Sequence, residues 1–211
     1  VFTYITAFSS STSNQHPDQL YKDGLQRSQF VPAIELMKRN MQVVNVDGGT
    51  DYRLRELERA GVYHVDGNAE GRLEQAFIGV ARHESADTSA LEIEGRVIQA
   101  RRHARGVAWF DFRALCDGPR GKADYIELAR RFHTILLSNI PQFKLDEADI
   151  VRRFTWLVDE FYDRRVKLIV SAAAAPGDLY AWAQGGDQFE RTISRLIEMQ
   201  TRDYLSEPHL A

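Results

Sequence analysis

Residues 124–170 read DYIELARRFHTILLSNIPQFKLDEADIVRRFTWLVDEFYDRRVKLIV, and this stretch decides the fold class. Asp124–Phe132 and Ile150–Arg165 carry apolar residues at helical spacing, whereas Thr134–Leu137 and Val166–Val170 are short aliphatic runs typical of buried strands. Strands that alternate with helices are joined by crossover connections, so this order predicts parallel strands with helices on both faces. The predicted fold class is therefore α/β with a largely parallel sheet.

The residues upstream show the same alternation, with one interruption in the middle of the chain. Before it, we expect three strands and four helices. The strands are Val1–Phe8, Gln42–Val46 and Val62–Val65. The helices are a short one opened by Pro17 and ending near Gly24, one opened by Pro32 with Ile34, Met37 and Met41 on one face, Asp51–Ala60 ended by Gly61, and Ala69–His83.

The interruption is a β-rich segment. Leu91–Ile98 alternates with period two around Glu94-Gly95, which predicts a hairpin, and Val107–Phe112 predicts a third strand of this insert. Gln188–Leu205 predicts a closing helix. We therefore divide the chain into residues 1–65, an insert at 66–123 and a second α/β portion at 124–211.

Composition excludes several classes of protein. The chain has 211 residues, is 44% hydrophobic and carries a net charge of -3, so it is globular and has no overall basic field to attract nucleic acid. One cysteine, Cys116, excludes an internal disulfide and a cysteine-based zinc site, and fits a reducing, cytoplasmic compartment. No stretch approaches the ~20 apolar residues of a transmembrane segment.

Two short motifs imitate nucleotide-binding chemistry. Residues 116–123 contain Gly121-Lys122, but Cys116 and Ala123 replace the first glycine and the hydroxyl residue of a phosphate loop, so we interpret the segment as a turn before a helix. Asp159-Glu160 follows apolar residues spaced three and four apart, which indicates a helical face with a Glu160–Arg164 ion pair. Cys116 with His133 as a base would make a hydrolase, but a lone cysteine after apolar residues is typically a small buried side chain.

Many short segments in collinear order resemble the ZapE-type AAA+ ATPases. They are Thr12-Ser13-Asn14, residues 17–27, Phe30-Val31-Pro32, Asp51-Tyr52-Arg53, Phe110-Asp111-Phe112, Leu115-Cys116, Asp124-Tyr125-Ile126, Phe132-His133-Thr134, Ile140-Pro141, Arg152-Arg153-Phe154, residues 157–162, Ser194-Arg195-Leu196 and Glu198-Met199-Gln200. Bacterial members of this family are linked to cell division, and mitochondrial relatives to quality control of membrane proteins.

The resemblance implies an incomplete P-loop (AAA+-type) parallel sheet with flanking helices and a small antiparallel β insert. It also implies that the intact protein binds ATP and magnesium, hydrolyses ATP and assembles as a homo-oligomer. In the family, a phosphate loop and an Asp-Glu strand precede the Thr-Ser-Asn segment, and neither stands in this sequence. We therefore expect this chain to be the C-terminal portion, to bind no cofactor alone and to associate with full-length ATPase subunits or cell-division proteins. A eukaryotic source would place it in the mitochondrial matrix.

The same resemblance assigns site residues. Asn14 would be the sensor-one residue, although Asn shortly before Pro17 also suits a turn. Arg27 would be an arginine finger that acts across a subunit boundary, or else a solvated arginine just past a helix end. Arg195, with Arg191 as second choice, would face the nucleotide as sensor two.

For these last two residues the alternative is ion pairing along their own helix, with Asp187, Glu190 or Glu198. For the chain as a whole, the alternative is a non-catalytic protein-interaction module.

Overall fold

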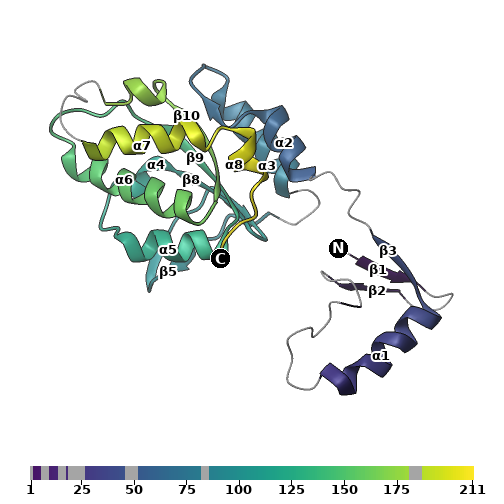
Figure 1. Ribbon diagram of the computed structural model, residues 1–211. Coiled ribbons are helices and arrows are strands. Elements are labelled where there is room, and N and C mark those ends of the chain that lie inside the picture. Colours follow the sequence, from purple (N-terminus) through teal and green to yellow (C-terminus); the bar gives the residue numbers. More distant parts are fainter. Residues whose placement is uncertain are drawn as a thin grey trace. The chain divides into compact units, whose positions relative to one another are not determined.

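The computed structural model describes residues 2–5, 10–13, 18, 27–45, 52–81, 86–180 and 187–211 (Figure 1). The chain divides into two compact units, Val1–Asp51 and Tyr52–Ala211, which we describe separately. The boundary between them lies inside the segment 1–65 that the sequence analysis took as one portion.

The first unit holds a three-stranded sheet and one helix. The strands are β1 (Phe2–Ile5), β2 (Ser10–Ser13) and β3 (Gln42–Asn45), and the helix is α1 (Arg27–Asn40). The central strand β1 pairs antiparallel with both neighbours, so the parallel arrangement expected for residues 1–65 is wrong for these strands. Only four residues join β1 to β2, which suits a hairpin and is too short for a parallel crossover.

Helix α1 begins at Arg27, five residues before Pro32, so the expectation that Pro32 opens it is wrong. A proline removes only one backbone donor, and the helix continues through that position. Of the three residues expected on one face, Ile34 is buried and Met37 and Met41 are half-buried.

The second unit is built on a five-stranded sheet in the order β4-β10-β9-β8-β7. Strands β8, β9, β10 and β4 are parallel, and β7 joins the edge antiparallel to β8. This confirms the α/β class. The bounds are β4 (Tyr63–His64), β7 (Arg102–Ala104), β8 (Val107–Asp111), β9 (Thr134–Ile140) and β10 (Lys167–Ala172).

Helices cover both faces of this sheet (Figure 1). Their bounds are α2 (Tyr52–Ala60), α3 (Ala69–Ala81), α4 (Phe112–Cys116), α5 (Lys122–Arg131), α6 (Ala148–Asp163), the 3-10 turn η2 (Pro176–Asp178), α7 (Asp187–Glu198) and α8 (Arg202–Ser206). Alternate strand residues feed two cores: Phe110, Leu137 and Val170 pack with α5 and α6, whereas Trp109 and Leu136 pack with α2 and α3.

The strand order explains why the helices lie on opposite faces. From β4 the chain crosses to β8 at the far side, and it then returns one strand at a time through β9 to β10. Right-handed crossovers in opposite directions place α3 on one face and α5 and α6 on the other. The chain leaves the neighbouring strands β4 and β10 toward opposite faces of the sheet. Their carboxyl ends therefore form a topological switch point.

The predicted hairpin is confirmed as β5 (Leu91–Ile93) and β6 (Arg96–Ile98). Glu94 and Gly95 both have positive φ angles, 47° and 69°, as a two-residue hairpin turn of the primed type requires. The third expected strand of the insert, β8, instead belongs to the parallel sheet, where it pairs with β9. Its antiparallel neighbour β7 was not predicted.

At the other end of the chain the expected closing helix 188–205 is interrupted. Thr201 is the N-cap of α8, and its side chain accepts a hydrogen bond from the Tyr204 backbone N–H at 3.3 Å.

The two motifs that imitate nucleotide sites take the structures expected of them. Helix α5 begins at Lys122 with Gly121 as its N-cap, so Gly121-Lys122 stands where the turn passes into the helix. Asp159 and Glu160 lie on α6, and Glu160 pairs with Arg164 at 2.6 Å. Cys116 is fully buried, and burial raises the pKa of its thiol, which opposes the thiolate that a nucleophile needs.

Candidate functional site

Arg27, the predicted arginine finger, is the first residue of α1 and is half-exposed. Its Nη2 donates a hydrogen bond to the backbone carbonyl of Asp18 at 2.7 Å. The Asp18 carboxylate in turn accepts from Lys38 Nζ at 2.8 Å, so both ends of α1 are tied to residue 18. A guanidinium has five donors, and this carbonyl uses one of them. Asn14, the predicted sensor residue, lies outside the described residues.

Arg191 and Arg195 lie on the same face of α7, as their spacing predicts. Arg191 Nη2 lies 2.9 Å from Asp159 Oδ2, and Arg195 binds the other oxygen of that carboxylate. Arg195 also contacts Asp163 at 3.2 Å, and its guanidinium lies 4.7 Å from the centre of the Tyr162 ring. All three partners stand on α6 and not on α7 itself. With 18% of its side chain exposed, Arg195 therefore joins the two helices.

The carboxyl edge of the second sheet carries a chain of hydrogen bonds between strand ends. Asp111 at the end of β8 caps α4 through Arg113 N and accepts from Asn139 Nδ2 at 2.8 Å. The backbone N–H of Asn139 donates to Ser171 Oγ on β10 at 2.9 Å. Asn139 has a φ angle of 65°, a conformation that asparagine tolerates better than most residues.

A second polar cluster ties the start of α3 to the same edge. Ser138 Oγ accepts from Trp109 Nε1 at 2.7 Å and from Arg101 Nη1 at 3.2 Å, and Arg101 also pairs with Glu70. A cavity of about 380 Å³ opens beside these residues, at the switch point between β4 and β10. The polar side chains around the cavity form hydrogen bonds and ion pairs with one another, and these contacts hold the strand ends together.

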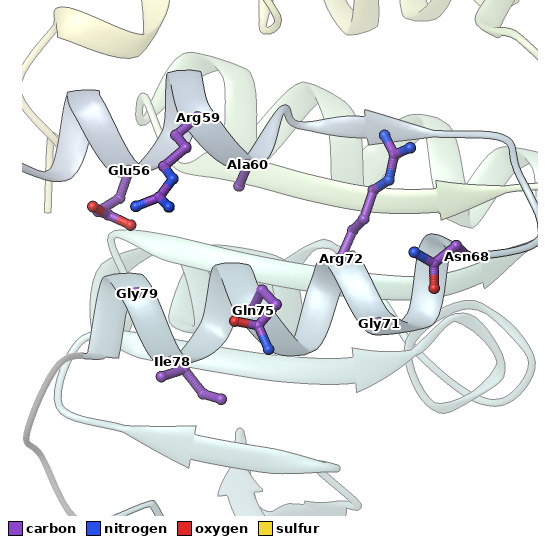
Figure 2. A pocket seen from close by; sticks show the side chains of 9 residues that line it. All are labelled: Glu56, Arg59, Ala60, Asn68, Gly71, Arg72, Gln75, Ile78 and Gly79. Atoms are coloured by element: carbon purple, nitrogen blue, oxygen red, sulfur yellow. The ribbon is translucent and has the colours of Figure 1, made fainter.

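A groove of about 460 Å³ lies between α2 and α3 (Figure 2). Helix α2 contributes Glu56, Arg59 and Ala60, and α3 with its preceding residue contributes Asn68, Gly71, Arg72, Gln75, Ile78 and Gly79. In Figure 2, the Arg59 side chain extends from α2 toward α3 at the end of the groove where Glu56 lies. The Arg72 side chain extends from α3 in the reverse direction, at the other end of the groove. The groove is thus lined by two guanidinium groups, two carboxamides and one carboxylate.

Neither this groove nor the hydrogen-bond network at the sheet edge was predicted from the sequence. The available signal was Asp66-Gly67-Asn68 directly after a short strand, a place where side chains of α/β proteins gather at a sheet edge. Nothing in the sequence indicates that α2 lies alongside α3, because that pairing is a tertiary contact.

Two kinds of feature are absent from the described ranges. No three histidine, cysteine or carboxylate side chains there come together as metal ligands. Nor is any helix there both long and apolar enough to traverse a bilayer.

Comparison with known proteins gives one consistent result. A model of the AFG1-like ATPase family matches residues 7–208. The chain is 39% identical to the cell division protein ZapE of Escherichia coli K12 over 204 residues, covering 95% of this chain and 54% of ZapE.

Eukaryotic relatives match over a similar range. Lactation elevated protein 1 homolog B of Danio rerio is 34% identical, over 92% of this chain and 46% of its own length. An uncharacterized protein of Schizosaccharomyces pombe is 32% identical, over 93% and 50%. The chain spans about half the length of these curated relatives. No solved structure matches it.

Proposed function

Since this chain belongs to the AFG1-like ATPase family, we propose that it forms part of an AAA+ ATPase and supplies Arg27 to the ATP bound by a neighbouring subunit. A guanidinium is permanently charged and can direct two donors at phosphoryl oxygens as charge develops on them. The observation that carries the proposal is the position of Arg27 at the start of α1, half-exposed and held by the Asp18 carbonyl. Among the described residues, that contact orients the side chain and uses one of the five guanidinium donors.

The family implies ATP with magnesium as the cofactor. The described residues offer ATP a cation at Arg27 but no converging set of acidic side chains for the metal. We therefore assign no phosphate loop and no magnesium ligands among the described residues. Asn14 as sensor one and Arg195, aided by Arg191, as sensor two remain proposals of the same kind. Arg195 would have to leave Asp159 or Asp163 to reach a nucleotide.

The partners proposed are further ATPase subunits of the same family, in a homo-oligomer. The printed name of the Escherichia coli relative places that protein in cell division, and we propose the same context and a cytoplasmic location for a bacterial source.

The test mixes this chain with a full-length relative whose own arginine at the matching position has been replaced by alanine. If Arg27 acts in trans, the wild-type chain should raise ATP turnover per intact subunit, and fingers of this type are worth roughly a thousandfold in rate. The Arg27→Ala chain should give no rise. Arg39→Ala is the matched control, because Arg39 is an exposed arginine in the last turn of the same helix.

A non-catalytic interaction module is the second candidate. It is favoured by exposed apolar side chains on α1, where Phe30, Val31 and Leu36 are 37%, 40% and 64% exposed. In that case the wild-type and Arg27→Ala chains would bind the full-length relative equally and change its turnover equally.

A further inference from the structure

The segment that carries Arg27 has a counterpart in the second unit. At a constant offset of 159 positions (171 − 12 = 159) and without a gap, residues 12–37 and 171–196 are identical at six positions, which pair as Pro17 and Pro176, Leu20 and Leu179, Tyr21 and Tyr180, Gln29 and Gln188, Phe30 and Phe189, and Ile34 and Ile193. Strands β2 and β10 end at the matched residues Ser13 and Ala172, and after the same offset α1 and α7 begin and end within one residue of each other. Residues 12–40 and 171–199 therefore share one strand–loop–helix pattern.

The apolar positions that recur in both copies are explained by packing. In the second copy, Phe189 is 6% exposed, and the centre of its ring lies 6.0 Å from that of Phe143 and 5.3 Å from that of Tyr180. In the first copy, Phe30 and the buried Ile34 are four residues apart and so lie on one face of α1. Apolar residues at helical spacing mark the face by which a helix is held to its unit, and they need no chemical role.

The charged residues around Arg27 do not recur at the matching positions. Arg27 Nη2 donates to the Asp18 carbonyl at 2.7 Å, and Lys38 Nζ lies 2.8 Å from the Asp18 carboxylate. The matching positions of the second copy hold residues without a charged side chain, namely Gly177, Gly186 and Ile197. The shared strand–loop–helix pattern therefore forms without this cluster, and packing of the helix does not account for it.

Lys38 stands where it can act on the direction of Arg27. It follows Arg27 by eleven residues (38 − 27 = 11), about three helical turns, so both side chains leave α1 on the same side. Asp18 contacts both of them, Arg27 through its carbonyl and Lys38 through its carboxylate. Glu35 lies 3.8 Å from Lys38 Nζ and adds a second acidic group. The hydrogen bond to Asp18, followed by its charge, raises the pKa of Lys38, so the ammonium group stays charged at neutral pH.

We propose that Lys38 is a positioning residue for Arg27: by holding the Asp18 carboxylate, it fixes the carbonyl that orients the guanidinium. This inference rests on the proposed function, because the orientation of Arg27 matters only if Arg27 acts on a nucleotide. A side chain held in one orientation before the reaction loses less conformational entropy during it. The pair is exposed, with 38% of the Lys38 and 52% of the Asp18 side chain accessible, so its effect should be far smaller than that of Arg27 itself.

The test is the mixing experiment with the full-length relative that lacks its own arginine, with kcat and KM for ATP measured at saturating chain. Lys38→Met keeps an unbranched side chain but removes the charge, and it should lower kcat by about two- to fivefold while association with the relative is unchanged. Lys38→Arg should restore most of that loss. Arg39→Met is the matched control, because Arg39 is the neighbouring cation in the last turn of α1, and its kcat should stay within about 1.3-fold of the wild-type chain.

Two further comparisons separate positioning from support of the fold. Asp18→Lys and Lys38→Asp each bring like charges together, and each should lower kcat at least as much as Lys38→Met does. The double variant Asp18→Lys with Lys38→Asp restores an opposite pair and should recover turnover. In the Arg27→Ala chain, Lys38→Met should cause no additional loss, because no guanidinium remains to be oriented.

The outcomes that contradict this inference differ from those that contradict the proposed function. If Arg27→Ala abolishes the gain in turnover but Lys38→Met matches the wild-type chain, the positioning role is wrong and the role of Arg27 stands. If Lys38→Met causes the same loss with and without Arg27, Lys38 does not act through Arg27. If Arg27→Ala itself has no effect, the proposed function fails and the positioning role fails with it.

Discussion

Gly106 stands in the turn between β7 and β8, and its replacement by alanine should destabilise the second unit strongly. Its φ angle is 74°, and an added Cβ would lie 2.6 Å from His133 Cδ2 and 2.7 Å from His133 Nε2. The Gly106 carbonyl also accepts from the backbone N–H groups of His133 and Thr134 at 2.9 and 3.2 Å, so the turn cannot move away without losing these bonds.

A second glycine, Gly95, allows the cost of backbone strain to be measured separately from the cost of steric overlap. Its φ angle is 69°, but no atom lies within 4 Å of an added Cβ. Gly95→Ala should therefore cost only the left-handed backbone strain, about 1–2 kcal/mol. Gly106→Ala should add the cost of forcing atoms into a filled space, about 1–3 kcal/mol, for a total of roughly 3 kcal/mol.

Urea unfolding followed by tryptophan fluorescence measures both variants, because all three tryptophans belong to the second unit. In the double variant Gly106→Ala with His133→Ala, the extra loss should shrink, since the colliding ring is gone. The reasoning is refuted if Gly106→Ala lowers the free energy of unfolding no more than Gly95→Ala does.

Three further predictions follow from contacts in the second unit. Arg195→Ala should lower the free energy of unfolding in urea by about 1–3 kcal/mol, because it leaves the mostly buried Asp159 without its buried partner. Arg191 is more exposed, so Arg191→Ala should cost less than about 0.5 kcal/mol. Equal losses in the two variants would contradict this ranking. Cys116 should react with a thiol reagent at the rate of global unfolding and not faster, since it is buried and burial raises its pKa. Burial, followed by the charge of Arg72, lowers the pKa of His64 in the folded chain. The unfolded chain therefore binds a proton at His64 more tightly than the folded chain does. As a result, the free energy of unfolding should fall as the pH drops below ~6.5. His64→Gln should flatten that part of the pH profile, and an unchanged profile would rule His64 out as its source.

The elements that sequence predicted well are those whose pattern is local and strong. Helix α6 places Phe154, Leu157 and Phe161 in the core at helical spacing, and the hairpin turn at Glu94-Gly95 is dictated by two positive φ angles. Neither depends on which distant segment packs against it. The Glu160–Arg164 pair is likewise a contact within one helix.

Contacts between distant segments could not be predicted in the same way. The sequence of β8 is typical of any short strand, and only its pairing with β9 and β7 makes it an interior strand, parallel to β9. Arg195 has acidic neighbours on its own helix, yet its partners come from α6, which is more than thirty residues away in sequence. The groove between α2 and α3 gives no local signal, because it arises only where the two helices pack together.

The two edges of the five-stranded sheet decide how readily another chain could extend that sheet by adding a strand. β4 is only two residues long, so it offers a newcomer almost no row of free backbone groups. At the opposite edge, the backbone N–H and carbonyl of His103 on β7 are already paired with Asp87, at 2.8 Å in each direction. Long, open edge strands invite other chains to extend a sheet and aggregate. With one edge minimal and the other partly paired, growth by addition of strands to the five-stranded sheet is disfavoured.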